Sequence, residues 1–189
     1  MSNQTTKVIG TPTEHISIIN QCLTGDNNAE YSLYKLYSRA IYNTCLRMLK
    51  YVPEAEDMLQ ETFVKIFSNL KKFDTKSNFY TWANRIAINN CINHQNKKGI
   101  DYTMDYEHEI VMKKADDEYS EEEIELSVES INKGILNLPN GYREIISLYL
   151  LEGYDHNEIG EILGISVSTS KSQYARAKKK LRELISSNG

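Results

Sequence analysis

The sequence predicts an all-α fold of two small helical domains joined by an acidic linker, the C-terminal domain being a helix-turn-helix. Apolar residues recur at three- and four-residue steps through most of the chain, whereas the alternation expected of strands is weak. Each of the three prolines stands where a helix should begin or end. Acidic residues dominate a central stretch, which divides the chain into domains at 13–97 and 121–186 and a linker at 98–120.

Four helices are predicted in the N-terminal domain. Thr13 is expected to cap the first helix, which ends before Gly25, and the second runs over about 28–51 with one apolar face. Pro53 opens the third helix, because proline fits the first helical turn. Ser77 can cap the fourth helix.

The C-terminal domain is predicted to hold four further helices, with Pro139 after the first. Asp155 and Glu158 have the spacing of a capping box, which marks the start of a short third helix. Gly164 supplies the positive φ that a tight turn needs, and Ser166 then caps the last helix.

Composition restricts the functions open to this chain. Its 189 residues, 40% hydrophobic and 25% charged, are typical of a folded protein. No apolar stretch has the roughly 20 residues of a membrane span. The N-terminal segment lacks a signal-peptide core, so we expect a cytoplasmic protein without direct membrane insertion. The net charge of −4 means that any DNA binding must depend on local positive charge.

The cysteines and histidines predict neither a disulfide framework nor a metal site. Cys22, Cys45 and Cys91 are odd in number and far apart, so each is expected to be a small core residue. The four histidines are scattered, and no glycine-rich phosphate loop or nucleophile motif is present. We therefore predict that the protein is not an enzyme and has no catalytic residue or cofactor.

The last predicted helix has the character of a DNA-reading helix. Its first turns are small and polar, which lets a helix enter the major groove with its N-terminal side chains at base edges. Basic residues such as Lys171 and Arg176 follow on the same helix. Arginine reads guanine best and lysine binds phosphates. An ordinary solvated helix face is the alternative interpretation.

A basic and aromatic segment joins the third and fourth helices. Aromatic faces such as that of Phe73 can stack on unpaired bases at roughly 1–3 kcal/mol each, while lysines such as Lys76 hold the backbone. The loop 73–78 is polar and able to line a pocket for one extruded base. Phe79 and Trp82, three residues apart, could instead be core residues.

The third predicted helix carries carboxylates along one side. Asp57 and Glu61 are four residues apart and repel each other, so a cationic partner would stabilise them. Glu54 lies near the same side, with Gln60 beside it. No histidine or cysteine is close in sequence, which argues against a metal site. A plain solvated face remains the alternative.

These segments together resemble the extracytoplasmic-function sigma factors. Residues 54–63 resemble the polymerase-docking helix of the family's second region, and 79–82 with 85–89 resemble its promoter-melting segment. Residues 138–143 and 164–181 resemble the fourth region. The three motifs occur in the family's order, with an acidic linker between them, which makes the resemblance specific.

The resemblance implies a sigma factor that binds the large subunits of core RNA polymerase and directs promoter recognition, promoter melting and transcription initiation. It implies polymerase binding by Glu54, Asp57, Gln60 and Glu61. It implies binding of the minus-ten element by Phe73, Lys76, Ser77, Asn78, Phe79, Tyr80, Trp82, Arg85 and Asn89. It implies binding of the minus-thirty-five element by Ser168, Thr169, Lys171, Ser172, Gln173, Ala175, Arg176 and Lys179.

The chain departs from the family in the last helix. Gln173 stands where an arginine is usual, Ser170 where an aliphatic residue is usual, and Ala175 where a larger side chain is common. These departures leave the upstream promoter sequence open.

One further partner, two interpretations of the linker and one alternative function follow from this interpretation. A cognate anti-sigma factor is implied by the resemblance alone. The acidic linker is expected either to thread the basic channels of the polymerase or to act as a passive tether. The alternative function is a two-domain helix-turn-helix regulator that acts on operators without polymerase docking; such a protein would not need the acidic helix or the aromatic loop.

Overall fold

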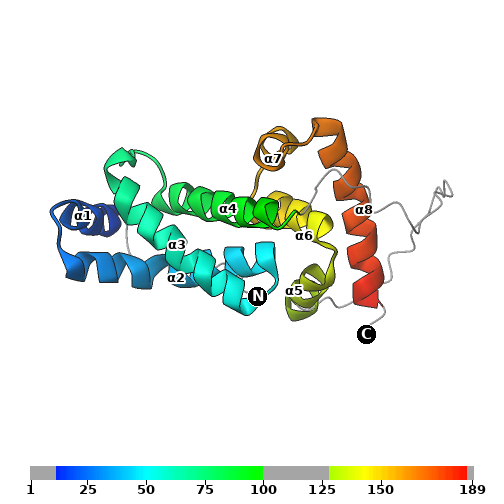
Figure 1. Ribbon diagram of the computed structural model, residues 1–189, viewed down its shortest axis with the longest axis horizontal. Helices are drawn as coiled ribbons and strands as arrows, with labels where there is room; N and C mark the ends of the chain where they lie inside the picture. Colours follow the sequence, from blue (N-terminus) through cyan, green and yellow to red (C-terminus); the bar gives the residue numbers. More distant parts are fainter. Residues whose placement is uncertain (1–11, 100–127, 187–189) are drawn as a thin grey trace. The chain divides into compact units, whose positions relative to one another are not determined.

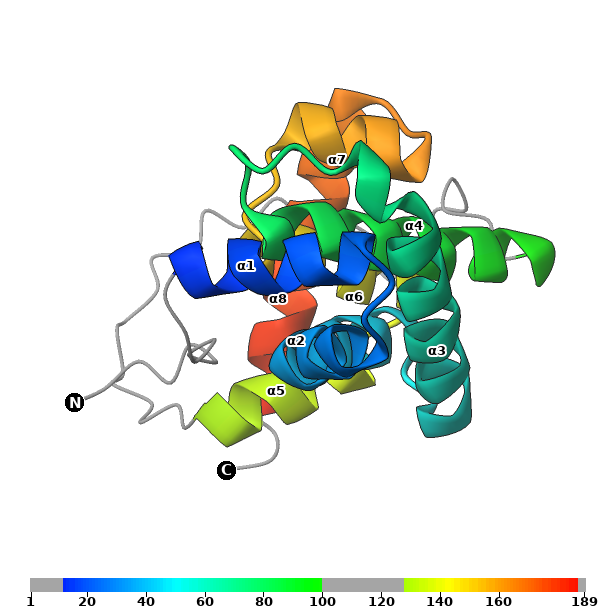
Figure 2. The same ribbon diagram turned by 90° about the vertical axis from the view of Figure 1, so that its left-hand side faces the viewer.

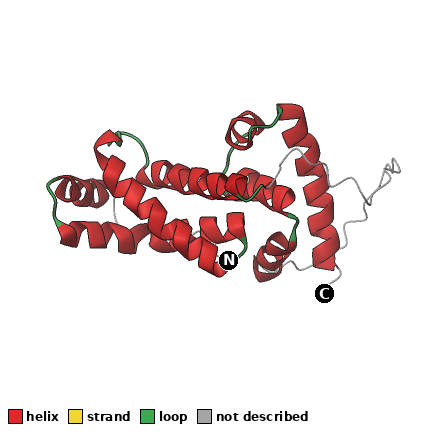
Figure 3. Cartoon of the chain, in the orientation of Figure 1, coloured by secondary structure: helices red, strands yellow, loops and turns green. Residues whose placement is uncertain are grey.

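The computed structural model describes residues 12–99 and 128–186, and within these ranges it contains helices, turns and loops but no strand (Figures 1 and 3). The chain divides into two compact units, one ending at Lys98 and the other beginning at Gly99. This confirms the predicted all-α fold. No helix in the described ranges is long and apolar enough to span a bilayer. The acidic stretch of the predicted linker lies outside the described residues.

The N-terminal unit consists of α1 (Pro12–Leu23), α2 (Asn27–Leu49), α3 (Val52–Asn69), a 3-10 turn η1 (Leu70–Lys72) and α4 (Phe79–Lys97). Helices α2, α3 and α4 pack against one another, and α1 lies against α2 (Figure 2). The predicted apolar faces meet in this core, whose most deeply buried members include Leu33, Ile41, Cys45, Ile66, Ala83 and Ile88. Cys22 and Cys91 are also buried, as expected of core cysteines.

Two helix starts differ from the sequence prediction. Helix α1 begins at Pro12, so Thr13 lies inside the first turn rather than at the cap. Helix α4 is capped by Asn78, whose side-chain oxygen accepts a hydrogen bond from the backbone N–H of Thr81 at 3.1 Å. The hydroxyl of Ser77 instead donates to the carbonyl oxygen of Asp74 at 2.7 Å. Ser77 therefore closes the preceding loop, and Asn78 takes the cap because it is the residue directly before the first turn of α4.

The C-terminal unit consists of α5 (Val128–Asn137), α6 (Asn140–Ile146), a π-helical turn η2 (Ser147–Leu151), α7 (His156–Leu163) and α8 (Val167–Ser186). Helix α8 packs against α5, α6 and α7. Its core contains Ile135, Leu138, Ile146, Ala177 and Leu181. The second helix predicted in this domain, after Pro139, is thus an α-helix that widens into a π-helical turn in its second half.

The junction of α7 and α8 is the predicted helix-turn-helix. The carboxylate of Asp155 accepts hydrogen bonds from the first turn of α7, and Glu158 accepts one in return from the backbone of Asp155 at 2.9 Å. Gly164 ends α7 with φ 68° and ψ 31°, the left-handed conformation that glycine adopts without steric cost. The hydroxyl of Ser166 accepts a hydrogen bond from the backbone N–H of Thr169 at 3.0 Å, which starts α8. The capping box and the glycine turn are confirmed.

Candidate nucleic-acid and protein interfaces

Helix α3 exposes a strip of side chains on the side away from the core. Asp57, Gln60 and Glu61 are exposed, whereas Glu54 is half-buried. Val64 continues the strip one turn further and is 66% exposed. Val64 was not predicted as part of this surface, because a single valine in an amphipathic helix is normally a core residue. The strip therefore combines acidic groups with one apolar contact point.

Two of these carboxylates already have cationic partners inside the unit. Glu54 accepts a hydrogen bond from Nζ of Lys98 at 2.6 Å and lies 3.3 Å from Nε2 of His94. The hydrogen bond from Lys98 lowers the pKa of Glu54, against the opposing effect of partial burial. Glu61 accepts a hydrogen bond from Nζ of Lys65 at 2.6 Å, which likewise lowers its pKa.

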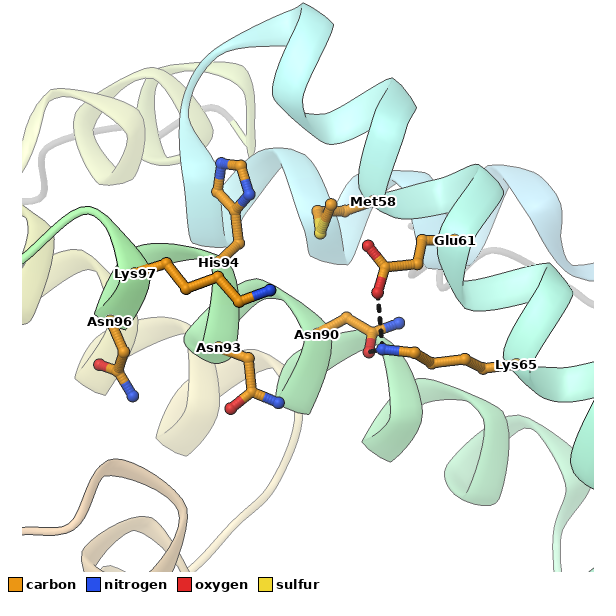
Figure 4. A pocket seen from close by; sticks show the side chains of 8 residues that line it. All are labelled: Met58, Glu61, Lys65, Asn90, Asn93, His94, Asn96 and Lys97. Atoms are coloured by element: carbon orange, nitrogen blue, oxygen red, sulfur yellow. Dashed lines mark hydrogen bonds and ion pairs between the residues drawn. The ribbon is translucent and has the colours of Figure 1, made fainter.

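A polar groove of about 450 Å³ separates α3 from α4 (Figure 4). Within it the ammonium group of Lys65 lies between Glu61 and Asn90 and donates to the amide oxygen of Asn90 at 2.6 Å. The amide nitrogen of Asn90 donates in turn to the hydroxyl of Thr62 at 3.0 Å. This chain of bonds ties the acidic strip of α3 to α4. The groove is lined by Met58, Glu61, Lys65, Asn90, Asn93, His94, Asn96 and Lys97.

The aromatic residues around the loop before α4 form a cluster. Phe73 and Phe79 are only 8% and 5% exposed, with ring centroids 5.3 Å apart in an edge-to-face arrangement. The ring of Trp82 lies 5.3 Å from Phe73 and 5.7 Å from Phe79, and Tyr37 lies 4.8 Å from Phe79. Phe79 is therefore a core residue, which was the alternative interpretation. Stacking of a base on Phe73 or Phe79 would require this cluster to open.

The exposed loop 74–78 between these two phenylalanines borders a second pocket, of about 340 Å³. Lys76, Ser77 and Asn78 line one side, as the sequence predicted. His15 and Tyr37 line it from α1 and α2, and the phenol oxygen of Tyr37 lies 2.7 Å from Nδ1 of His15. Burial raises the pKa of Tyr37 to about 12, so the phenol stays protonated at neutral pH. No local pattern in the sequence marks these two residues, because tertiary packing alone brings them to the loop.

The outer face of α4 carries polar side chains at helical spacing. Arg85 and Asn89 are exposed, and Tyr80 is half-buried near the start of the helix. Asn93 and Asn96 extend the exposed row toward the C-terminal end and also line the groove beside α3. A helix with this face presents amide groups and a guanidinium to one side, which suits base edges and phosphates.

Helix α8 exposes most of the residues predicted to contact DNA. Ser168, Lys171, Ser172, Ala175 and Lys179 are exposed, and two others are partly covered, namely Thr169 and Arg176. Gln173 differs, because its side chain is buried on the inner face of the helix. Direct base contact by Gln173 would need that side chain to leave the core.

Ser170 is also buried on α8, and it is held by a group from α7. Its hydroxyl lies 2.9 Å from Nδ1 of His156. The imidazole of His156 stacks on Tyr149 at 4.7 Å between ring centroids and meets the edge of Tyr174 at 5.5 Å. A polar and aromatic cluster thus joins α8 to α7 and to the π-helical turn. Ser170 stands out in the sequence as a departure from the family, but no local pattern predicts His156 as its partner.

Comparisons with known proteins match both units. The model of Sigma-70 region 2 matches residues 33–99, and the model of Sigma-70 region 4 matches residues 129–181. The chain is 37% identical over 175 residues to the ECF RNA polymerase sigma factor SigW of Bacillus subtilis (strain 168), covering 87% of this chain and 93% of the relative. It is 30% identical over 175 residues to the RNA polymerase sigma-H factor of Pseudomonas aeruginosa, covering 85% and 88%.

Two solved structures share the fold. The sigma factor RpoE from Bartonella quintana, in complex with the anti-sigma factor NepR, aligns with a TM-score of 0.54 at 23% identity, over 82% of this chain and 96% of that one. CnrH, in complex with the cytosolic domain of CnrY, aligns with a TM-score of 0.53 at 20% identity, over 93% and 98%. At these identities the likeness supports the helical architecture.

Proposed function

The chain belongs to the sigma-70 family as a sigma factor of the extracytoplasmic-function type, and from this we propose how its two units divide the work of initiation. A protein of this family is not an enzyme; it binds core RNA polymerase and directs promoter recognition, promoter melting and transcription initiation. We assign polymerase docking and the minus-ten element to residues 13–97 and the minus-thirty-five element to residues 121–186, with 98–120 as the connection.

The docking surface is the exposed strip of α3. This assignment rests on Asp57 and Gln60, because both are exposed on the helix that resembles the family's docking helix. The exposed Val64 would add an apolar contact at the C-terminal end of the same surface. Glu54 and Glu61 are engaged by Lys98 and Lys65 in the free protein, so they would have to exchange partners on docking.

The minus-ten element is assigned to the loop 74–78 and the outer face of α4. Lys76, Ser77 and Asn78 border a pocket of about 340 Å³, which is large enough for one extruded base. Arg85 and Asn89 lie on the exposed face of α4, where they would contact the backbone and base edges. Phe73, Phe79, Tyr80 and Trp82 serve chiefly to fix this loop and helix, with Trp82 and Tyr80 at the partly exposed rim.

The minus-thirty-five element is assigned to α8. The small exposed residues at its start allow close approach to the major groove, and Arg176 and the lysines supply bidentate and phosphate contacts. Gln173 would act from within the unit, by setting the position of the helix rather than by reading a base.

The net charge of −4 makes the two DNA-reading units dependent on the polymerase. Neither unit would bind a promoter tightly alone, but docking on the polymerase holds both near their elements at high effective concentration. We expect the protein to act in the cytoplasm. A cognate anti-sigma factor is a further expected partner, as RpoE was solved with one.

Run-off transcription with purified core polymerase on a promoter library tests this function. The expected result is transcription from a subset of promoters that share a minus-ten and a minus-thirty-five motif, together with promoter binding by the complex that far exceeds binding by the free protein. Equal promoter affinity with and without core polymerase would instead support the two-domain regulator.

A further inference from the structure

Glu54 connects the docking helix to the promoter-facing helix. It stands in the first turn of α3, while both of its nitrogen partners, Lys98 and His94, stand at the C-terminal end of α4. The side chain of Glu54 is 26% exposed and that of Lys98 is 47% exposed, so the pair sits at the surface and can open without unfolding the unit. The same carboxylate therefore occupies two nitrogen groups at the end of the helix that carries Arg85 and Asn89.

These two donors have the chemistry of a phosphate site. Lys98 supplies a charged ammonium group, whose Nζ lies 2.6 Å from Oε1 of Glu54. His94 supplies an imidazole nitrogen, Nε2, which lies 3.3 Å from Oε2 of the same carboxylate. A DNA phosphate presents a similar pair of anionic oxygens. Lysine side chains beside a DNA-reading helix normally bind the backbone. In the free protein this position is already filled by Glu54.

We propose that Lys98 and His94 form a DNA-phosphate site that Glu54 masks in the free protein, and that docking on core polymerase draws Glu54 away and uncovers it. The proposal rests on the assignment of α3 as the docking helix. Polymerase and DNA then each compete with the same internal ion pair, so each favours binding of the other. The pair thereby helps to restrict promoter binding to the polymerase-bound state.

The size of this coupling is limited by the strength of the ion pair. A surface pair contributes at most about 1 kcal/mol, which corresponds to a closed form roughly fivefold more populated than the open form. A ligand that needs the open form then gains up to about fivefold in affinity when the pair is removed. Effects of about two- to fivefold are therefore expected.

The first test measures binding of the full-length chain to core polymerase. Lys98→Gln, which frees Glu54, should tighten binding about two- to fivefold, whereas Lys35→Gln on α2 makes the same charge change far from this pair in sequence and should not. In a Glu54→Gln background the gain from Lys98→Gln should vanish. If the gain persists in that background, it reflects simple charge repulsion between Lys98 and the polymerase, and the proposal is overturned. Unchanged or weaker polymerase binding by Lys98→Gln alone would also overturn it. If Lys98→Gln does not fold, Lys98→Met removes the same charge and is measured in its place.

The second test measures binding of the free chain to a labelled 20-nucleotide oligo-dT strand, which offers phosphates without a promoter sequence. Glu54→Gln should tighten binding about two- to fivefold and steepen its salt dependence by up to about 0.7 in log–log slope. Glu56→Gln removes the same charge from an exposed position two residues further along α3, on another side of the helix, and should have little effect. Equal effects of both variants would contradict the masked site.

The docking surface on α3 and the masked phosphate site can be disproved independently of each other. If Asp57→Asn leaves polymerase binding intact, the docking surface is wrong. If Asp57→Asn weakens polymerase binding but Lys98→Gln does not tighten it, the docking surface stands and the masking is wrong.

Discussion

The Nδ1 atom of His156 lies 2.9 Å from the hydroxyl oxygen of Ser170, and this contact joins the first residue of α7 to a fully buried position on α8. The bond is directional, so it fixes how far α8 is rotated about its own axis relative to α7. That rotation decides which side chains of α8 face outward. An aliphatic residue at 170 would fill the space without setting the angle.

Loss of this bond should destabilise the C-terminal unit and change its promoter preference. Ser170→Ala leaves Nδ1 of His156 unpaired, and we expect a loss of about 1 kcal/mol in the free energy of unfolding, measured with urea. His156→Asn should retain more of the stability than His156→Gln, because its amide can reach the place of Nδ1, while both variants lose the ring contacts with Tyr149 and Tyr174. Equal stability of the Asn and Gln variants would mean that the contact at Nδ1 has no directional role.

Gly160 in α7 is expected to resist substitution. A Cβ added there would lie 2.9 Å from the backbone carbonyl oxygen of Ile165, which cannot move without disturbing the turn. We expect Gly160→Ala to cost about 1–3 kcal/mol in unfolding free energy, because the inserted methyl group forces the backbone apart. Gly134→Ala is the control: its Cβ would meet the side-chain ends of Leu181 and Ile185, which can rotate away, so its cost should be smaller.

The stability of the C-terminal unit should fall at acid pH through Asp155. Hydrogen bonds from the backbone N–H groups of Glu158 and Asn157 lower the pKa of Asp155 below its ordinary value of 3.8. A lowered folded-state pKa gives stability that is present above pH 3.8 and is lost as the pH falls through the folded-state pKa. Asp155→Asn keeps a cap but should remove this part of the pH dependence, which thermal melting between pH 2 and 6 would measure. Asp155→Ala should melt lower than Asp155→Asn at every pH.

Asp57 should matter for polymerase binding and little for folding. Asp57→Asn removes one charge from the exposed strip of α3 and should weaken binding to core polymerase by about 1–2 kcal/mol, as expected of a central interface residue. Glu30→Gln on α2 makes the same charge change away from α3 and is the control. Fluorescence titration of labelled protein with core polymerase measures both, and similar losses for the two variants would argue against the α3 surface.

Arg176 should affect use of the upstream promoter element. Arg176→Ala is expected to weaken binding of the polymerase complex to that element by about 1–3 kcal/mol and to relax its sequence preference at one position. Lys180→Ala on the same helix removes a cation that is paired with Glu183 at 3.4 Å, so it should have a smaller and sequence-independent effect. Transcription from a library with randomised upstream elements separates these outcomes.

Local signals in the sequence were sufficient for most of the fold. The Asp155–Glu158 capping box and the turn at Gly164 were predicted because each depends on residues close together in the chain, and both are present. The start of α4 was misplaced by one residue, because Ser77 and Asn78 are both good caps and only the geometry of the loop decides between them. The π-helical turn at 147–151 has no pattern that distinguishes it from an ordinary helix.

The sites were predicted less completely, because burial depends on tertiary packing. Lys76 and Arg85 are exposed where a DNA contact needs them, but Phe73 is buried in a cluster that also includes Trp82 and lies near α2. The spacing of aromatic residues does not reveal whether they face solvent or the core. His15 illustrates the same limit, since it reaches the pocket beside the loop from the far end of the domain sequence.

The five residues 74–78 lie between two phenylalanines that are packed into the protein interior. Because the anchors on both sides are fixed by aromatic contacts, substitutions at Thr75 and Lys76 need not disturb the helices, whereas Asn78 must be kept as the cap of α4. The tip of this segment therefore behaves as an interchangeable module whose chemistry can vary while its framework is kept. If the loop reads the minus-ten element as proposed, new promoter preferences could arise from these two positions with little effect on folding.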